Sequence, residues 1–267
     1  LPKTAFSLTN LDDKNGEVML QNTKAKRYTY SLKTMADFRA IIIDDSFDGL
    51  HLKIDNEEVF CNLIGQFNAY NLLAIYSAAI LCGLKKEEVL VHLSELNSAS
   101  GRFESYHLKN GSVVIIDYAH TPDALENVLK TINDIRPKKK NNEETPKIIT
   151  VVGCGGDRDR SKRPIMASIA EKLSDIVVLT SDNPRTEDPN MILEEMKKGI
   201  NGNDRNVFTI VDRREGIKLG CTLAKKGDIV LIAGKGHETY QEINHVKHHF
   251  DDKEIIRNVF EAEKAVD

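Results

Sequence analysis

The sequence predicts an α/β protein whose larger part is a Rossmann-like, mostly parallel sheet, and three observations lead to this prediction. Beyond residue 100, short apolar runs alternate with segments that have the periodicity of amphipathic helices. Such alternation is typical of parallel strands joined by crossover helices. The 267 residues are 40% hydrophobic, which is enough for one large core or two smaller ones. Four of the apolar runs are also followed by unusual loop sequences, as expected at the ligand-binding edge of such a sheet.

The first hundred residues predict a smaller unit of mixed structure. Residues 27–54 are polar and β-prone, with a turn at Asp48 and Gly49. The stretch "GQFNAYNLLAIYSAAILCG" (65–83) has helical periodicity and ends at a glycine, the residue best suited to a helix C-terminus. A second amphipathic helix is predicted over 85–96. The small polar residues 98–101 then suggest a boundary, so we expect domains at 1–100 and 101–267.

The second domain contains the alternating elements. Its strands are predicted at Val113–Ile116, Ile148–Val152, Ile176–Thr180, Val207–Val211 and Ile229–Ala233. Its helices are predicted at Pro122–Ile135, Arg163–Leu173, Pro189–Ile200 and Arg214–Ala224. The stretch "QEINHVKHHF" (241–250) predicts a hairpin, and residues 251–265 predict a final helix.

Composition excludes several classes of function. The net charge is only −4 although 29% of the residues are charged, so no broad basic field for nucleic acid or an anionic membrane is expected. The four cysteines are far apart in sequence and form no CxxC pair, which favours reduced thiols over disulfides or a zinc site. No run approaches the roughly 18 apolar residues of a membrane-spanning helix. We therefore expect a cytoplasmic protein.

The loops that carry unusual sequences follow the first, second, third and last apolar runs: "DYAHTP", "GCGGDRD", "SDNPRTED" and "AGKGHE". In a doubly wound sheet, ligands bind beyond the carboxyl ends of the strands. We therefore expect these four loops to meet at one edge and to form the site.

Each loop also has a purely structural interpretation. The glycines of "GCGGDRD" could form a tight turn, or their bare N–H groups and Arg158 could receive an anion. "DNPR" is by itself an ordinary Asn-Pro turn. "AGKGHE" lacks the spacing of a Walker sequence, and none occurs in the chain. Cys154 has no paired base, which favours a structural role over a nucleophile.

Two further pairs of polar residues leave similar alternatives open. Asn68 and Asn71 are three residues apart on a predicted helix and so face the same way; they could read the edge of a heterocycle, or cap and pack. His120 and His237 could act as bases or serve as hydrogen-bonding spacers.

Taken together, these stretches resemble the Mur ligase family, the ATP-dependent amide-forming enzymes of peptidoglycan synthesis. The resemblance covers nearly the whole chain and rests on stretches in matching order, namely "TNLDD" (9–13), "GQFNAYN" (65–71), "SGRFE" (100–104), "DYAHTPDAL" (117–125), "GCGGDRD" (153–159), "KRP" (162–164), "DNPRTEDP" (182–189) and "AGKGHE" (233–238). Within the family the match is closest to the MurE branch, which adds the third residue of the stem peptide.

The resemblance implies a domain content and a set of nucleotide contacts. Residues 1–100 would be the last part of a central ATPase domain, and 101–267 a C-terminal domain that receives the amino acid. The implied ATP contacts are Asn68, Asn71, Arg102, Asp117 and His120. Amides suit a base edge, a cation suits phosphate and a carboxylate suits ribose hydroxyls. The P-loop and the carbamylated lysine that helps to hold Mg²⁺ lie upstream in the family, so we expect no metal ligand here.

The resemblance also implies an amino-acid pocket for meso-diaminopimelate, because the DNPR sequence marks members that select it over L-lysine. Diaminopimelate is lysine with a second carboxylate, which a guanidinium at Arg185 would pair with. The implied contacts are Arg158, Asp182, Asn183, Arg185, Gly234 and Glu238.

The implied reaction joins meso-diaminopimelate to UDP-MurNAc-L-Ala-D-Glu through an acyl phosphate, with ATP and Mg²⁺ as cofactors. No catalytic residue is assigned. We expect a monomer, a fragment of a longer ligase that is inactive alone. The alternatives are a sibling amide ligase of the MurF or folylpolyglutamate synthetase type, and a non-catalytic module that binds an amino acid or nucleotide.

Overall fold

The structure, a computed structural model, describes residues 1–137, 145–201, 206–261 and 263–264. The chain divides into two compact units, Leu1–Asn97 and Ser98–Asp267, and each is described by itself. Among the described residues, no helix combines the length and the apolar character needed to cross a bilayer.

The first unit is a five-stranded sheet with helices packed on it. Its strands, in the order β1-β2-β3-β4-β5, are Phe6–Asn10, Lys26–Ser31, Phe38–Ser46, Gly49–Ile54 and Glu57–Cys61. The helices are α1 (Gly16–Met19), α2 (Gln66–Leu81) and α3 (Lys86–Glu95). Apolar side chains of α2 and α3, such as Leu72 and Leu93, pack on β3, β4 and β5 to form the core. The predicted β-prone stretch, its turn before Gly49 and both helices are confirmed.

The second unit is a seven-stranded sheet in the order β10-β9-β8-β11-β7-β6-β14. The strands are β6 (Glu104–His107), β7 (Val113–Asp117), β8 (Ile148–Val152), β9 (Ile176–Thr180), β10 (Val207–Ile210), β11 (Ile229–Ala233) and β14 (Glu263–Lys264). The five strands from β10 to β7 are parallel, whereas β6 runs antiparallel to β7 and β14 antiparallel to β6. The mostly parallel α/β sheet predicted from the sequence is confirmed.

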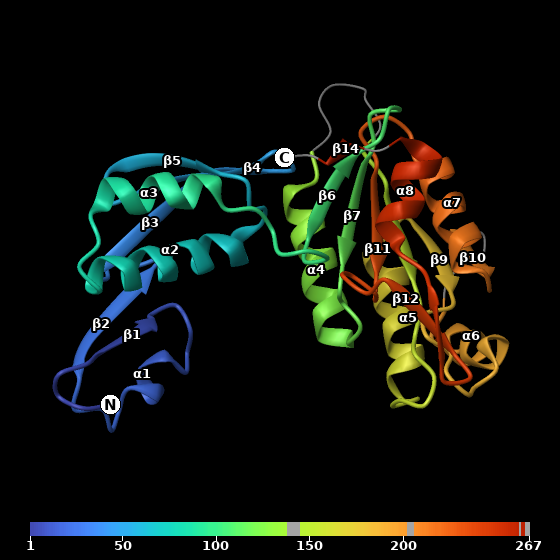
Figure 1. The fold of residues 1–267 in the computed structure, drawn as a ribbon, viewed down its shortest axis with the longest axis horizontal. Coiled ribbons are helices and arrows are strands. Elements are labelled where there is room, and N and C mark those ends of the chain that lie inside the picture. The colour runs from blue at the N-terminus through green and yellow to red at the C-terminus, as the bar shows by residue number, and fades with distance from the viewer. Residues whose placement is uncertain (138–144, 202–205, 262, 265–267) are drawn as a thin grey trace. The chain divides into compact units, whose positions relative to one another are not determined.

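The helices of this unit are α4 (Pro122–Ile135), α5 (Lys162–Leu173), α6 (Pro189–Lys197), α7 (Arg213–Leu223) and α8 (Asp252–Phe260). Helix α5 packs beside both α4 and α6, while α7 packs beside α8 (Figure 1). Ile217 of α7 and Ile256 of α8 lie in one core cluster with sheet residues such as Val151 and Ile232. Side chains of these helices and of the central strands thus bury the sheet.

The helix starts follow from local sequence. Thr121, Asp188, Asp212 and Asp251 cap α4, α6, α7 and α8 with their side-chain oxygens. The last helix is shorter than predicted, because Glu261 adopts a left-handed conformation (φ 48°) and ends α8 at Phe260. Ala265, where we placed its end, lies outside the described residues. The predicted hairpin is present as β12 (Tyr240–Ile243) and β13 (Val246–His249).

Candidate functional site

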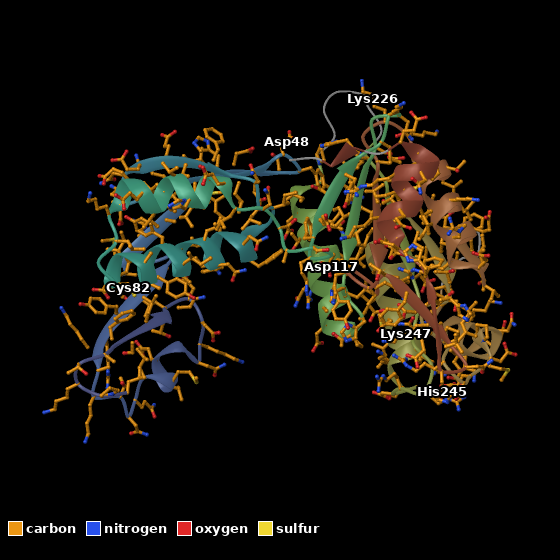
Figure 2. The ribbon with its side chains drawn as sticks, viewed as in Figure 1. Asp48, Cys82, Asp117, Lys226, His245 and Lys247 are labelled. Atoms are coloured by element: carbon orange, nitrogen blue, oxygen red, sulfur yellow. The ribbon has the colours of Figure 1, made fainter. Side chains whose placement is uncertain are left out.

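The carboxyl ends of β7, β8, β9 and β11 lead into one pocket of about 570 Å³. It is lined from all four loops by Tyr118, His120, Thr121, Pro122, Gly153, Cys154, Gly155, Arg158, Asp159, Ser161, Lys162, Ile165, Asp182, Asn183, Arg185, Gly234 and Glu238. Figure 2 marks Asp117 and the hairpin residues His245 and Lys247 toward one end of this sheet, and Lys226, which precedes β11, at the other. The predicted convergence of the four loops is confirmed.

The glycines of "GCGGDRD" allow two loops to touch. A side chain on Gly153 would lie 2.4 Å from the Thr180 carbonyl oxygen, and one on Gly156 would lie 1.9 Å from the Pro184 oxygen. The Gly156 N–H also donates to the Asn183 carbonyl (2.9 Å), so it is not bare. At these two positions, close backbone approach explains the glycine, and the interpretation as an N–H anion cradle is wrong for Gly156.

Two arginines lie on either side of Gly155. A side chain there would lie 2.8 Å from Arg185 Nη1 and 3.7 Å from Arg158 Cγ. Arg185, in the left-handed region (φ 51°), donates through Nη1 to the Gly156 carbonyl (2.8 Å), and its Nε lies 3.4 Å from Glu242 Oε2. Arg158 is exposed and has no hydrogen bond or ion pair with any residue that the structure describes. The pocket therefore has one guanidinium held in place and one free to bind an anion.

Acidic and amide groups form a second cluster in the same pocket. Asn183 is 3% exposed, and its Nδ2 donates to Glu238 Oε2 (2.8 Å) while its Oδ1 accepts from the Glu242 N–H (3.0 Å). Gly234 has φ 117°, and a side chain on it would lie 2.6 Å from Asp182 Oδ2. The predicted amino-acid contacts are thus brought together, with glycine required where the carboxylate of Asp182 approaches.

Two buried cations hold elements around this pocket, Lys235 in the acid and amide cluster and Arg163 outside it, and sequence reasoning assigned a function to neither. Lys235 donates to Asn183 Oδ1 (3.0 Å) and lies 3.2 Å from Glu238 Oε2. Arg163 donates to both oxygens of Glu187 (2.7 and 2.9 Å) and to Glu195 Oε2 (2.7 Å). Arg163 is the middle residue of "KRP", but its burial depends on carboxylates 24 and 32 positions away, so the motif alone gave no signal.

The Arg163 clamp joins the loops after β8 and β9. Besides its carboxylate partners, Arg163 Nη2 donates to the Gly155 carbonyl (3.2 Å). Its hydrogen bonds lower the pKa of Glu187 to about 2. The arginine thereby links the "GCGGDRD" turn to the loop that carries Arg185.

The residues predicted to contact ATP in this unit surround Tyr118. The Arg102 guanidinium lies 4.9 Å from the Tyr118 ring centre, and the His120 and His237 rings lie 4.5 and 5.0 Å from it. His120 Nδ1 lies 2.8 Å from the Tyr118 carbonyl oxygen. Arg102 is exposed and has no carboxylate partner among the described residues, which suits a phosphate contact.

Asp117 is less free than the prediction of a ribose contact requires. It is 7% exposed, and its Oδ2 accepts from the Phe103 N–H (2.7 Å). Burial raises the pKa of Asp117, against the effect of N–H donors from Phe103 and Ala119 and of the Arg102 charge. The carboxylate thus holds the turn that presents Arg102.

Asn68 and Asn71 lie on α2 of the first unit, on one face as predicted. Asn71 Nδ2 donates to Asn68 Oδ1 (3.2 Å), and Asn68 Nδ2 donates to the Ile64 carbonyl (2.8 Å). Asn68 is half-buried and Asn71 exposed. Both predicted alternatives have support, because Asn68 ties down the start of the helix while the Asn71 Oδ1 faces no protein donor among the described residues.

Other candidate groups have structural roles. Cys154 is buried, its Sγ lies 3.6 Å from Met166 Sδ, and burial raises the pKa of its thiol to about 12. This supports the structural interpretation over a nucleophile. Within the ranges that the structure describes, no three His, Cys, Asp or Glu side chains are grouped so as to hold a metal ion.

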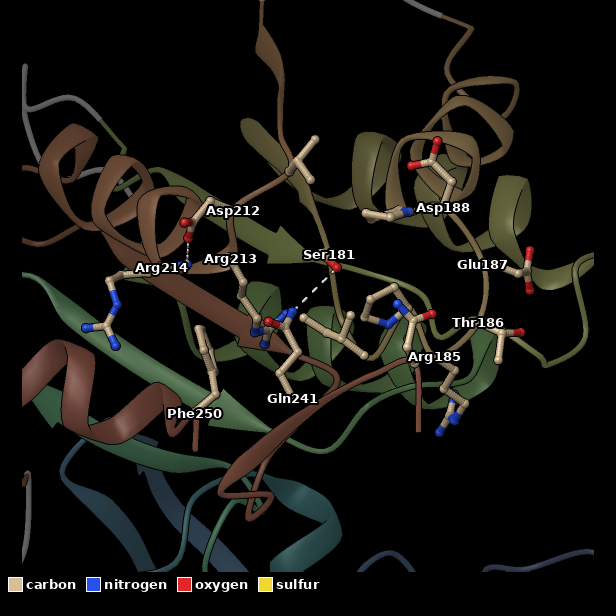
Figure 3. A pocket seen from close by; sticks show the side chains of 15 residues that line it. Ser181, Arg185, Thr186, Glu187, Asp188, Asp212, Arg213, Arg214, Gln241 and Phe250 are labelled. Carbon is tan, nitrogen blue, oxygen red and sulfur yellow. Dashed lines mark hydrogen bonds between the residues drawn. The ribbon is translucent and has the colours of Figure 1, made fainter. Parts of the chain in front are cut away.

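A larger cavity, about 820 Å³, lies beside the same loops (Figure 3). Its acids already have partners in the fold: Glu187 binds Arg163, and Asp188 and Asp212 cap helices. Arg213, at its wall, is fully buried and paired with Asp252 (2.7 Å). Arg185 borders both cavities, but the smaller pocket also contains Arg158, which has no partner among the described residues, and all four loops lead into it, so we take it as the candidate site.

Two models of the Mur ligase family match the chain. The family model of the "Mur ligase, glutamate ligase domain" matches residues 101–236, and that of the "Mur ligase middle domain" matches residues 1–79. A curated "UDP-N-acetylmuramoyl-L-alanyl-D-glutamate--2,6-diaminopimelate ligase" of Phocaeicola vulgatus is 54% identical over 264 residues, covering 98% of this chain and 53% of that protein. The protein of the same name from Clostridioides difficile is 44% identical over 259 residues, covering 94% of this chain and 52% of the relative. The chain therefore spans about half the length of these relatives.

Solved structures are similar in fold. A structure of a "UDP-N-acetylmuramoyl-L-alanyl-D-glutamate--2, 6-diaminopimelate ligase" is 39% identical, with a TM-score of 0.69 over 96% of this chain and 53% of its own. The UDP-N-acetylmuramate-alanine ligase MurC from Thermotoga maritima is 20% identical, with a TM-score of 0.58 over 88% of this chain and 47% of its own, which shows a shared fold alone.

Proposed function

This chain belongs to the Mur ligase family, and from that premise we propose that it forms the amino-acid-selecting half of an ATP-dependent amide ligase. The names of the curated relatives give the two substrates, UDP-N-acetylmuramoyl-L-alanyl-D-glutamate and 2,6-diaminopimelate, and we propose that this chain selects the meso form of the latter. The reaction belongs to peptidoglycan precursor synthesis.

One observation carries the choice of amino acid. A single pocket is lined by two arginines, Arg158 and Arg185, and by a cluster of acid and amide groups around Asn183. Diaminopimelate has an ammonium and a carboxylate at each end, and this pocket offers arginines to a carboxylate and acid and amide groups to an ammonium. L-Lysine lacks the second carboxylate and would leave an arginine without its anion.

We assign the recognition of the distal carboxylate to Arg158 and Arg185. Arg185 is already oriented by the Gly156 carbonyl and by Glu242, which limits the loss of side-chain freedom on binding. Glu238, Asp182 and Gly234 would hold the ammonium and carboxylate of the other centre, with Asn183 beside them.

The nucleotide is the second substrate in this proposal. When bound, ATP would supply the phosphoryl group that activates the acceptor carboxylate. Arg102, free of carboxylate partners among the described residues and presented by the Asp117 turn, fits a phosphate oxygen. The His120 ring and the Arg102 guanidinium lie 4.5 and 4.9 Å from the centre of the Tyr118 ring. In the first unit, Asn71 is the amide that we propose for the base.

The test is an NMR titration of the chain with meso-diaminopimelate and, separately, with L-lysine, because chemical shifts follow even millimolar binding. We expect shifts around Arg158, Asn183 and Arg185 with diaminopimelate and weaker binding of lysine. Arg185→Ala should weaken diaminopimelate binding about tenfold or more, since a charged hydrogen-bonding group is lost, and should leave lysine binding nearly unchanged.

The matched control is Arg214→Ala. Arg214 is also exposed and lines the larger cavity, which Arg185 borders too, but it does not line the candidate pocket; its guanidinium lies 5.9 Å from the centre of the Phe250 ring. It should bind diaminopimelate like the unsubstituted chain. Equal affinity of the Arg185→Ala variant and the unsubstituted chain for diaminopimelate would contradict the assignment.

A further inference from the structure

Lys235 is a buried ammonium directly behind the candidate pocket. It follows Gly234 in the loop after β11, and its side chain is 0% exposed. It does not line the pocket, whereas its two polar partners, Asn183 and Glu238, both do. Burying an ammonium costs several kcal/mol unless it is paired and hydrogen-bonded, so its partners must hold it strongly.

The hydrogen bonds among Lys235, Asn183 and Glu238 show which side-chain atoms of Asn183 and Glu238 are already paired within the protein and which remain for a ligand. Asn183 Oδ1 accepts from both Lys235 Nζ (3.0 Å) and the Glu242 N–H (3.0 Å), so the amide has one possible orientation. Glu238 Oε2 accepts from Asn183 Nδ2 (2.8 Å) and from Lys235 Nζ (3.2 Å). Glu238 Oε1 has no hydrogen-bond partner among the described residues, so one carboxylate oxygen remains for a ligand.

We propose that Lys235 is a positioning residue that holds the Glu238 carboxylate and the Asn183 amide in the orientation that receives the ammonium end of the amino acid. This inference rests on the proposed function, because it concerns the same pocket. Lys235 itself touches no ligand. It acts by fixing the Oε2 side of the carboxylate, which leaves Oε1 for the ligand.

The physical reason for this role is that the Glu238 carboxylate can adopt a second orientation, toward solvent. Its side chain is 15% exposed, so without the ammonium the carboxylate can turn toward water, where it is better solvated. Asn183 alone would then hold it, through a single hydrogen bond from a neutral donor. A charged donor forms roughly twice as strong a bond to a carboxylate and keeps it in the wall of the pocket.

The inference separates Lys235 from the arginines of the site. Arg158 and Arg185 act on the carboxylate that distinguishes diaminopimelate from lysine, whereas Lys235 acts on the end that the two amino acids share. Loss of Lys235 should therefore weaken both ligands equally, and loss of Arg185 should weaken one.

The experiment measures the affinity of the chain for meso-diaminopimelate and L-lysine by two-dimensional NMR in four forms: unsubstituted, Lys235→Met, Glu238→Gln, and the double variant. We expect Lys235→Met to weaken both ligands about tenfold, with their affinity ratio unchanged. In the Glu238→Gln background the same substitution should have little further effect, because its route to the ligand is already gone. The side-chain amide signals of Asn183 should shift in Lys235→Met.

The same spectra report whether each variant is folded. If Lys235→Met is unfolded, Lys235→Gln replaces it, since glutamine keeps a hydrogen-bond donor but not the charge. The affinities of the four forms are then measured with this substitution in its place. Equal affinity with and without Lys235, or an undiminished loss in the Glu238→Gln background, would overturn the inference while leaving the proposed function intact. Absence of any binding by the unsubstituted chain would overturn the proposed function and this inference with it.

Discussion

Replacement of Arg163 by Met would remove the clamp between the two loops that carry Arg158 and Arg185. The guanidinium is fully buried and donates four hydrogen bonds, to Glu187 Oε1 and Oε2, to Glu195 Oε2 and to the Gly155 carbonyl. Methionine has a similar length and no charge, so the substitution removes the bonds with little change in volume.

The expected loss in the free energy of unfolding depends on the carboxylates that remain without the arginine. Removing one partner of a buried ion pair costs about 3–5 kcal/mol. Here Glu187 and Glu195 remain 22% and 16% exposed, and Glu195 keeps Arg160 as a partner, so both carboxylates retain some solvation. We therefore expect the lower end, a loss of about 3 kcal/mol in the free energy of unfolding.

The assay is urea denaturation of the chain, followed by a signal from the second unit. With an m-value of about 2 kcal/mol per molar urea, the midpoint should fall by about 1.5 M. Lys197→Met is the control, because Lys197 pairs with Glu194 on an exposed surface and should cost less than about 0.5 kcal/mol. A loss below about 1 kcal/mol in Arg163→Met, comparable to the control, would refute the reasoning that this clamp holds the two loops together.

The remaining predictions concern the same loops. Gly156→Ala should destabilise the chain by about 1–3 kcal/mol in urea, because its side chain would lie 1.9 Å from the Pro184 carbonyl oxygen. Gly155→Ala, whose side chain would lie 2.8 Å from the Arg185 guanidinium and 3.7 Å from the Asn183 carbonyl oxygen, should instead lower diaminopimelate affinity with less loss of stability; the reverse order of the two would contradict the loop geometry. Acid should also weaken the clamp: the pKa of Glu187 is about 2, below its ordinary value of 4.5, so its contribution is complete above pH 4.5 and disappears as the pH falls toward 2. The dependence of the urea midpoint on pH in this range should be shallower in Glu187→Gln, and an unchanged profile would count against the ion pair.

Many strands and helices of the second unit could be predicted because short sequence patterns determine where they begin and end. The runs 148–152, 176–180 and 229–233 form strands with the predicted ends, and α4 spans Pro122–Ile135 as expected. Apolar runs of this length can bury both faces only in a central parallel strand, and Thr121 with Pro122 specifies a helix start. The prediction that the four loops meet followed from the predicted parallel strands, since the carboxyl ends of parallel strands lie at one edge of the sheet.

Elements that depend on distant partners were not predictable in this way. Strand β6 and the short β14 exist through antiparallel pairing at the sheet edge, and α8 ends earlier than its periodicity suggested. The sequence "GGDRD" likewise left two interpretations open. Only the contact of Gly156 with Pro184, 28 positions away, shows that its glycine serves loop packing.

The sequence by itself determined the α/β class, the order of the strands along the chain, the edge of the sheet where the four loops meet and the charged residues there. The tertiary structure decided which of those charges are free. Lys235 and Arg163 are in sequence ordinary solvated cations, yet both are buried, because acceptors 52 and 24 positions away surround them. Arg158, equally unremarkable in sequence, is the one of the three left exposed and without a described partner. Burial and pairing of these cations depend on contacts between loops that are distant along the chain, and local sequence patterns do not predict such contacts.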